Sequence, residues 1–520
     1  MKSEGELDLA HPFFLPCDDP CVLCDMTDAL LLGIDLGSSS VKASVVNAST
    51  GRSLATAQSP DHEMVIDAPS PGWAEQDPAL WWTHVVKAVR SCMAKANADG
   101  NRVVAIGISY QMHGLVTVDE QGSPLRPSII WCDSRAVDIG NKAWSSLGPE
   151  FCNEHYLNSP GNFTASKLRW VRENEPHIYK RIAKIMLPGE YIAMRITGDV
   201  LTTPSGLSEG ILWDFSSHEP ARDLMDYYDI NPALLPVSTA VFSIQGKITS
   251  AAADELGISP DTIVSYRAGD QPNNAFSLGV TEPGETAATA GTSGVIYSVT
   301  DLNLFDSLSR VNTFVHVSNA SHERRNGVLL CVNGTGILNR WLRDNFTGLS
   351  YEQMNIAGRE VAIGADGLSM LPFGNGSERI LGNRTLGASI QGLDLNRHHR
   401  GHLVRASQEG IVFSLNYGFE ILKSIGLVPS VIKAGYGNMF LSPLFREAFV
   451  NTIGVPLELY DTDGATGAAL GAGIGAGVYS TYQDAFRGLK QTGIEEPVDH
   501  LREKYLHSYH RWETILNNAL

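Results

Sequence analysis

One cluster of small and acidic residues near the start of the chain has the composition of a phosphate-binding turn. Asp35 ends an apolar run and is followed by one glycine and three serines: Gly37, Ser38, Ser39 and Ser40. Glycine lets the backbone approach an anion closely, and successive N–H groups form a concavity that binds anions. A carboxylate beside such a turn can hold Mg²⁺ through water. Taken alone, these residues suit an ordinary hairpin turn equally well.

A second copy of this pattern lies about half a chain further on. It consists of one glycine and two hydroxyl residues: Gly291, Thr292 and Ser293. A valine follows each copy at the same spacing, Val41 in the first and Val295 in the second. The repetition predicts two similarly built halves, each opening with two strands whose connecting turn faces the other half. It also favours phosphate binding for both turns.

A further carboxylate, Asp270, stands where a strand-like run ends in Gly-Asp and a helix begins. Side chains at such a strand end point into the space beyond the sheet. An aspartate there is suited to accept the proton of a sugar hydroxyl that attacks a γ-phosphate. Aspartate is also a common helix N-cap, so both roles stay open at this point.

Neutral polar groups follow another strand-like run, residues 103–108. Gln111 and His113 offer donors and acceptors for sugar hydroxyls, and Met112 supplies an adaptable apolar wall. Histidine in a turn is often purely structural. Asp133, in the segment 131–135, either binds hydroxyls or pairs with Arg135.

Two glycine-rich segments complete the candidates. The first, residues 432–438, contains Gly435, Gly437 and Asn438, and the second spans 464–473. Small side chains let a nucleotide base slide against the backbone, and they equally let helices pack closely. A P-loop string is absent from the sequence.

The elements that must position these residues alternate along the chain, which predicts an α/β fold. Strand-like runs occur at 103–109, 262–266, 328–332 and 431–434, and helix-like runs at 78–96, 406–425 and 442–453. Asp77-Pro78 and Ser442-Pro443 are start signals for two of these helices. Residues 1–27 show neither helical nor strand-like hydrophobic periodicity, which predicts an appended arm. Its Cys17, Cys21 and Cys24, with His11, form a weak zinc-binding pattern.

The composition excludes several classes of protein. The chain has 520 residues, of which 43% are hydrophobic, and a net charge of −18. This length favours two large domains, and the acidic balance repels nucleic acid. The sequence shows no membrane segment, no basic signal peptide and no disulfide framework among its seven cysteines. It therefore predicts a cytoplasmic protein without nucleic-acid or membrane partners.

Taken in order, these segments resemble the FGGY family of carbohydrate kinases, from about Met26 to the C-terminus. I-D-L-G-S-S and A-G-T-S-G resemble its phosphate segments, and A-G-Y-G-N with G-A-T-G-A-A-L-G its nucleotide segments. Q-M-H-G, G-W-A-E-Q-D-P and W-C-D-S-R resemble the xylulokinases of the family. The resemblance implies two actin-like (ribonuclease H-like) ATPase lobes with a central cleft: a sugar-binding lobe at 28–280 and a nucleotide-binding lobe at 281–520.

The resemblance further implies ATP-dependent phosphorylation of D-xylulose to D-xylulose 5-phosphate by in-line transfer. Asp270 would be the base, and with Asp35 it would hold Mg²⁺. The sugar would contact five residues: Gln111, Met112, His113, Asp270 and Gln271. ATP would contact the glycine and hydroxyl residues of both turns and of the first glycine-rich segment: Gly37, Ser38, Ser39, Gly291, Thr292, Ser293, Gly435, Gly437 and Asn438.

Two departures from the xylulokinase pattern keep alternatives open. Gln271 stands where many xylulokinases have asparagine and is also seen in glycerol kinases, and segment 371–379 resembles only a subset of bacterial xylulokinases. A kinase of ribulose, glycerol or another polyol is therefore an alternative, as is a non-catalytic sensor or an actin-like chaperone ATPase. The presence of both Asp35 and Asp270 favours catalysis. A homodimer is a candidate assembly.

Overall fold

The structure, a computed structural model, describes residues 28–520. The predicted arm at residues 1–27, with its cysteines and its weak zinc pattern, therefore lies outside the described residues. No helix within the described part of the chain is long and apolar enough to cross a membrane.

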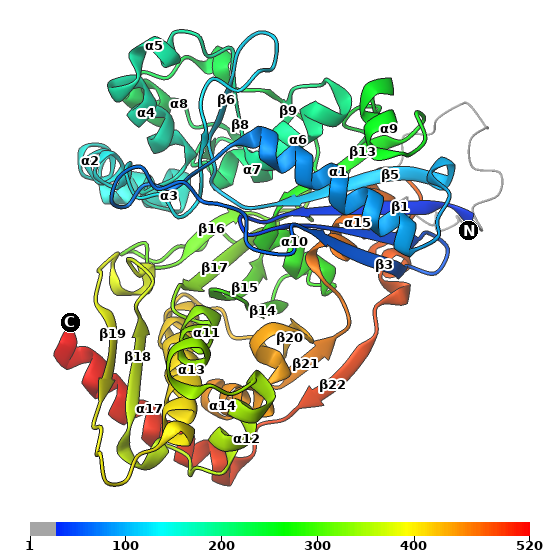
Figure 1. Ribbon diagram of the computed structural model, residues 1–520. Helices are drawn as coiled ribbons and strands as arrows, with labels where there is room; N and C mark the ends of the chain where they lie inside the picture. Colours follow the sequence, from blue (N-terminus) through cyan, green and yellow to red (C-terminus); the bar gives the residue numbers. More distant parts are fainter. Residues whose placement is uncertain (1–27) are drawn as a thin grey trace, which may run out of the picture.

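The first half of the chain forms a five-stranded sheet, drawn mainly in blue in Figure 1, in the order β13-β5-β1-β2-β3. Its strands are β1 (Leu30–Leu36), β2 (Val41–Asn47), β3 (Arg52–Ser59), β5 (Val103–Tyr110) and β13 (Ile263–Gly269). β1, β2 and β3 pair antiparallel, whereas β5 and β13 run parallel to β1. The carboxyl ends of β1, β5 and β13 therefore meet at one edge of the sheet.

The second half forms a seven-stranded sheet in the order β16-β17-β15-β14-β20-β21-β22. Its strands are β14 (Thr286–Ala290), β15 (Gly294–Thr300), β16 (Asn312–Val315), β17 (Asn326–Val332), β20 (Ile432–Gly435), β21 (Leu457–Tyr460) and β22 (Gln491–Glu495). The inner five strands repeat the order and the directions of the first sheet: three antiparallel strands are followed by two parallel ones. The predicted internal repeat is thus confirmed at the level of topology.

Helices cover both sheets. The first sheet packs on α1 (Pro78–Lys95), α6 (Pro188–Thr197) and α9 (Ser250–Leu256) through one hydrophobic cluster. The second packs on α13 (Arg400–Ser424), α14 (Pro443–Ile453) and α17 (Asp499–Ala519) through another. The two predicted start signals are confirmed, since Asp77 accepts a hydrogen bond from the N–H of Ala79 and Ser442 from that of Phe445. Each is followed by proline at the first helical position.

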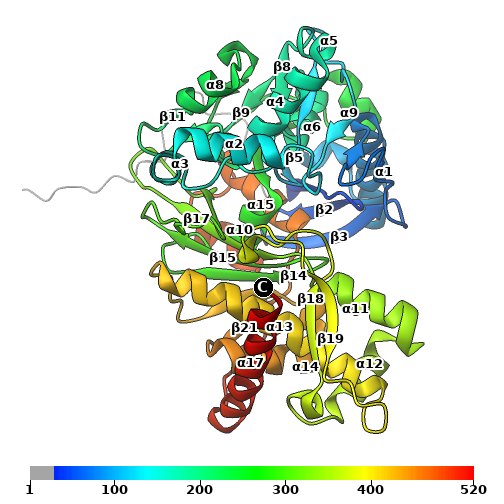
Figure 2. The ribbon, with the colours of Figure 1, turned by 90° about the vertical axis from the view of Figure 1, so that its left-hand side faces the viewer.

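Smaller elements complete each half. The first half adds β6 (Val116–Val118), α2 (Val137–Leu147), α3 (Pro149–Tyr156), α4 (Thr164–Asn174), α5 (Pro176–Tyr179), β8 (Lys184–Met186), α7 (Pro204–Glu209) and α8 (Arg222–Tyr228). Of these, α4, α5 and α8 lie at the top of Figure 2. The second half adds α11 (Gly336–Leu342), α12 (Tyr351–Arg359) and the hairpin of β18 (Ser369–Phe373) and β19 (Gly387–Gln391).

Two helices tie the halves together. α10 (Asp270–Ser277) follows the first sheet directly and contacts β14 and β15 of the second. α15 (Gly464–Gly475) comes late in the chain but packs on β1 and β5 of the first sheet, among the blue strands of Figure 1. A methyl group on Gly33 would lie 1.8 Å from the carbonyl oxygen of Ala465, and one on Gly107 would lie 1.9 Å from that of Ala468. Glycine at both strand positions therefore permits this close approach.

Candidate active site

The two halves enclose one large cleft of about 1160 Å³. All site residues predicted from the sequence line it: Asp35, Gly37, Ser38, Ser39, Gln111, Met112, His113, Asp270, Gln271, Gly291, Thr292, Ser293, Gly435, Gly437 and Asn438. They come from strand ends and turns of both sheets. The roles assigned to them individually stay predictions, but the structure does bring them to a single place.

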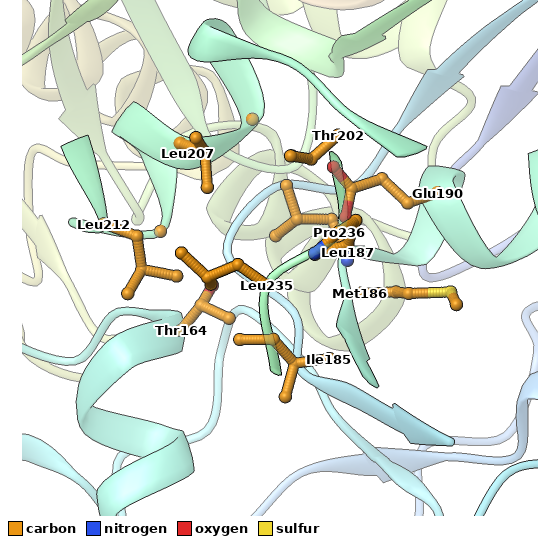
Figure 3. A pocket seen from close by; sticks show the side chains of 12 residues that line it. Thr164, Ile185, Met186, Leu187, Glu190, Thr202, Leu207, Leu212, Leu235 and Pro236 are labelled. Atoms are coloured by element: carbon orange, nitrogen blue, oxygen red, sulfur yellow. Dashed lines mark hydrogen bonds between the residues drawn. The ribbon is translucent and has the colours of Figure 1, made fainter. Parts of the chain in front are cut away.

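A second, much smaller cavity lies among residues of α6, α7 and β8 (Figure 3). Its volume of about 20 Å³ suffices for roughly one water molecule. Glu190 and Thr202 supply polar atoms there, and most other lining side chains are apolar. It is too small to be a substrate site.

Asp35 is the last but one residue of β1 and points into the cleft. Its Oδ1 accepts a hydrogen bond of 2.9 Å from the Ser109 hydroxyl on the neighbouring strand. Burial raises the pKa of Asp35, and the charge of Asp463 adds to this, while Lys42 and Ser109 act in the opposite direction. The carboxylate is therefore held in place by β5 and keeps acceptor capacity toward the cleft.

Asp270 opens α10 at the end of β13. The N-cap of this helix is Gly269, and Asp270 lies inside the first turn, so the N-cap interpretation of this aspartate is wrong. Burial raises its pKa to about 7, the nearby charge of Asp35 adds to the shift, and hydrogen bonds from Gln271 partly offset it. A carboxylate that exchanges its proton near neutral pH is suited to general base catalysis.

The two predicted phosphate turns connect β1 to β2 and β14 to β15. In the first, the N–H of Gly37 bonds to the carbonyl of Ser40 at 3.0 Å. In the second, the carbonyl of Gly291 accepts the N–H of Gly336 at 2.9 Å, so the start of α11 packs directly on the turn. Both turns lie at the edge of the cleft with their small side chains lining it.

The first glycine-rich segment, residues 432–438, lies close to the second turn. A methyl group on Gly291 would lie 3.7 Å from Nδ2 of Asn438, and Asn438 has a positive φ of 52°. Tyr436, between Gly435 and Gly437, is half-exposed and lines the cleft. The segment thus presents glycine backbone, one amide and one aromatic ring to the same space as the phosphate turn.

His113, one of the predicted sugar contacts, also lines the cleft. Its Nδ1 lies 2.8 Å from the carbonyl oxygen of Glu209, which only accepts, so Nδ1 carries the proton. Burial, with a contribution from the charge of Lys167, lowers the pKa of His113 to about 3, so the ring is neutral at ordinary pH. Nε2 is then a hydrogen-bond acceptor. Phe163 packs edge-on against the ring at 4.8 Å.

The remaining polar candidates are held by internal partners. Gln111 Nε2 donates to Oε1 of Gln76 at 3.1 Å, while the buried Gln111 Oε1 has no hydrogen-bond partner among the described residues. Asp133 is fully buried, accepts the N–H of Ala74 at 2.6 Å and pairs with Arg135 at 2.7 Å. Of the two interpretations offered for Asp133, pairing with Arg135 is the one observed.

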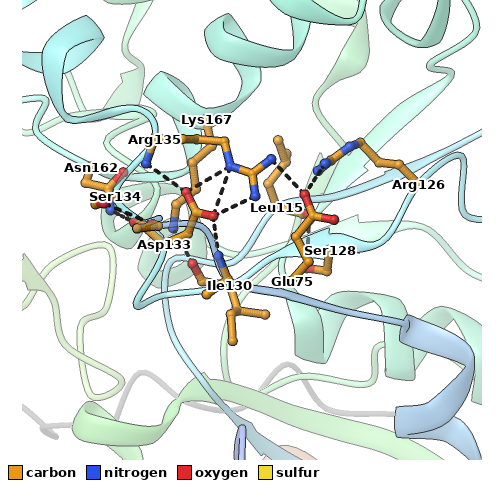
Figure 4. Close-up of polar contacts among 12 residues, drawn as sticks. Glu75, Leu115, Arg126, Ser128, Ile130, Asp133, Ser134, Arg135, Asn162 and Lys167 are labelled. Carbon is orange, nitrogen blue, oxygen red and sulfur yellow. Dashed lines mark hydrogen bonds and ion pairs between the residues drawn. The ribbon is translucent and has the colours of Figure 1, made fainter. Parts of the chain in front are cut away.

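Arg135 belongs to a larger buried ion network, drawn in Figure 4. It pairs with Glu75 at 2.7 Å, and Glu75 also pairs with Arg126. The ring of Trp73 lies 3.8 Å from the guanidinium carbon of Arg135. The segments G-W-A-E-Q-D-P and W-C-D-S-R are thereby bound to each other, and residues of both line the cleft.

Sequence reasoning missed three charged residues that line the cleft: Lys42, Arg379 and Asp463. Lys42 lies directly opposite Asp35 in the β1–β2 register, so strand alternation was a signal that could have found it. Asp463 caps α15, accepting the N–H of Thr466 at 2.8 Å. Arg379 ends the segment 371–379, whose resemblance to some xylulokinases assigned it no role, and it follows a loop after β18.

The acidic groups of the cleft fit a divalent cation. Asp35 raises the pKa of Asp270, and Asp463 raises that of Asp35, so three like charges gather at one place. Within residues 28–520, no group of three or more metal-binding side chains could hold an ion unaided. Mg²⁺ is commonly bound by one or two carboxylates together with substrate phosphates and water, which this arrangement allows.

Comparison with known proteins agrees with this picture. Residues 30–277 match the model of the FGGY family of carbohydrate kinases, N-terminal domain. The chain is 30% identical over 417 residues to the xylulose kinase of Haemophilus influenzae, covering 78% of this chain and 82% of that one. It is 29% identical over 443 residues to the xylulose kinase of Escherichia coli, covering 85% and 88%.

Solved structures of sugar kinases also superpose on this chain. The crystal structure of xylulose kinase from Rhodospirillum rubrum superposes with a TM-score of 0.81 at 25% identity, covering 94% of this chain and 98% of that one. A glycerol kinase from Plasmodium falciparum superposes with a TM-score of 0.82 at 19% identity, covering 95% and 98%, which is a likeness of fold alone.

Proposed function

This chain belongs to the FGGY family of carbohydrate kinases, and from that premise we propose that it transfers the γ-phosphoryl group of ATP to the terminal hydroxyl of D-xylulose. The observation that carries the proposal is the position of Asp270, a carboxylate at the end of β13 in the cleft that the predicted sugar contacts and the predicted phosphate turns line together. The several relatives named xylulose kinase support the choice of sugar.

In the proposed reaction, the substrates approach Asp270 from two sides. The sugar lies against Met112 and His113, where neutral Nε2 accepts a hydrogen bond from a sugar hydroxyl. The terminal hydroxyl then faces Asp270, which removes its proton as the oxygen attacks the γ-phosphorus. Since phosphoryl transfer needs mostly positioning and charge stabilisation, placing both partners in one cleft provides the main rate gain.

The phosphates are proposed to lie between the two turns. Backbone N–H groups around Gly37 and Gly291 would donate to phosphate oxygens, and the ammonium of Lys42 would balance their charge. Asp35 and Asp270 would hold Mg²⁺, which neutralises charge on the transferred phosphoryl group. Gly435, Gly437 and Asn438 would contact the rest of the nucleotide.

The same proposal assigns residues 28–280 to sugar binding and 281–520 to nucleotide binding. Movement of the two halves toward each other would exclude water and limit wasteful ATP hydrolysis. Glycerol is the alternative substrate that a specific observation favours. Gln271 lines the cleft beside Asp270, and the Asp-Gln pair resembles that of glycerol kinases.

The test is ADP release by the purified protein with D-xylulose, D-ribulose, L-ribulose and glycerol. We expect the highest kcat/KM for D-xylulose and a 1:1 ratio of ADP to sugar phosphate. A preference for glycerol would replace the proposed substrate, and ATP turnover without sugar phosphate would contradict kinase activity toward all four.

A further inference from the structure

Arg379 brings a cation from the second half of the molecule to the sugar-facing end of the cleft. It opens the short helix Arg379–Leu381, which follows β18. Its guanidinium carbon lies 5.1 Å from the centre of the Phe163 ring, and a methyl group on Gly161 would lie 3.3 Å from its Nη2. Phe163 in turn packs on His113 at 4.8 Å, so Arg379 reaches the surroundings of the predicted sugar contacts.

The backbone that carries Arg379 is firmly anchored. The carboxylate of Glu378 turns away from the cleft and accepts the N–H of Asn333 at 3.0 and 3.1 Å. The next two residues, Ile380 and Leu381, are buried in the core of the second half. Because both neighbours are fixed, the guanidinium is presented to the cleft in a defined place, as a specific binding group requires.

The charge of Arg379 lacks a protein counter-ion. Among the described residues it forms no ion pair, and its one hydrogen bond runs from Nη1 to the carbonyl of Ser309 at 3.3 Å. Burial lowers its pKa to about 10, so it remains charged at neutral pH. Arg379 is partly exposed within the cleft, and its guanidinium can only donate hydrogen bonds. A ligand bound in the cleft that offers an acceptor oxygen would supply the partner that the described residues do not.

We propose that Arg379 determines specificity by binding an acceptor-only oxygen, the keto oxygen of a ketose or the carboxylate of a sugar acid, at the end of the sugar remote from the phosphorylated hydroxyl. This inference rests on the proposed function and deepens it. It predicts that the kinase selects carbonyl-bearing sugars over polyols, since a polyol hydroxyl at that position accepts a hydrogen bond but also carries a proton of its own. Sugar binding then depends on a residue from each half of the molecule.

The test compares the full chain with Arg379→Gln, Arg379→Lys and the matched control Arg384→Gln. Arg384 is exposed and does not itself line the cleft, and its side chain donates a hydrogen bond to the main-chain oxygen of Leu520. The kcat/KM values are measured for D-xylulose, D-xylonate and xylitol at saturating ATP. Thermal unfolding of each variant verifies that it is folded.

We expect Arg379→Gln to lower kcat/KM for the preferred carbonyl or carboxylate substrate by about 10- to 100-fold, the range of a lost hydrogen bond to a charged group. Xylitol turnover and the KM for ATP should change by less than about threefold, well below that range. For Arg379→Lys, kcat/KM for the preferred substrate should lie between the values of the unchanged chain and of Arg379→Gln, because lysine keeps the charge but loses the planar guanidinium with its paired donors. Arg384→Gln should show the same kcat/KM for all three sugars and the same KM for ATP as the unchanged chain.

Equal losses for all three sugars, or a raised KM for ATP, would overturn the proposal. If the unchanged chain prefers D-xylonate to D-xylulose, the proposed ketose is wrong and the role of Arg379 stands. If no sugar of the panel is phosphorylated, calorimetric binding of D-xylulose and D-xylonate decides, because equal affinities of the unchanged chain and Arg379→Gln contradict the inference.

Discussion

Replacing Asp270 by asparagine should make the protein inactive and, at alkaline pH, more stable. The substitution keeps the shape of the side chain but removes its charge. Loss of a general base costs about 10²- to 10⁴-fold in kcat. Because Asp270 acts on the sugar hydroxyl and not on the nucleotide, the affinity for ATP should change little.

The stability change follows from the pKa of Asp270, which burial and the charge of Asp35 raise from 3.8 to about 7. Between these values the folded protein holds a proton that the unfolded chain releases, so the free energy of unfolding falls as pH rises. Above pH 7 the full penalty applies, at most about 4 kcal/mol at 1.36 kcal/mol per pKa unit. Asparagine does not carry this penalty.

Urea unfolding of both proteins at pH 4.5 and pH 8 measures the effect, and kcat is measured in parallel. We expect the advantage of Asp270→Asn to be small at pH 4.5 and to reach a few kcal/mol at pH 8. An advantage that does not grow with pH would refute the raised pKa of Asp270. A kcat within tenfold of the unchanged chain would refute its role as base.

The same geometry leads to three further expectations. His113→Ala should raise the sugar KM about tenfold or more, as expected for one lost hydrogen bond, with the KM for ATP little changed; the opposite pattern would move His113 out of the sugar site. In the unchanged chain, kcat/KM for the sugar should rise about tenfold per pH unit up to about pH 7 and level off above it, because the basic form of Asp270 is the active one; a profile that is flat between pH 5 and 8 would contradict this. Gly33→Ala should lower the free energy of unfolding in urea by about 3 kcal/mol or more, because the added methyl meets the backbone of α15; an unchanged midpoint would mean that the helix can shift.

The features that sequence can predict are those with local signals. The end of β13 is visible as an apolar run closed by Gly-Asp, and this pattern alone predicts that Asp270 faces the space beyond the sheet, where the cleft lies. The repeat of the two turns is visible because glycine and hydroxyl residues recur at one offset. The inner five strands of the second sheet match the five strands of the first in order and direction, which confirms that repeat.

The features that sequence reasoning missed depend on contacts between distant segments. Arg379 reaches Gly161 and Phe163 from more than two hundred positions away, and nothing in its own loop indicates that. The small residues of 464–473 are compatible with a nucleotide and with close helix packing. Only the approach of α15 to Gly33 shows that most of this segment packs on the first sheet, while Gly464 alone reaches the cleft.

The path of α15 has a consequence for how the molecule can be divided. A chain cut near residue 280 would leave the amino-terminal piece with one face of its sheet uncovered, at the glycine positions where α15 belongs. The carboxyl-terminal piece would carry an apolar, glycine-rich helix with no surface to receive it. The two halves therefore share α15, and each piece of such a cut would lack contacts that the intact chain provides.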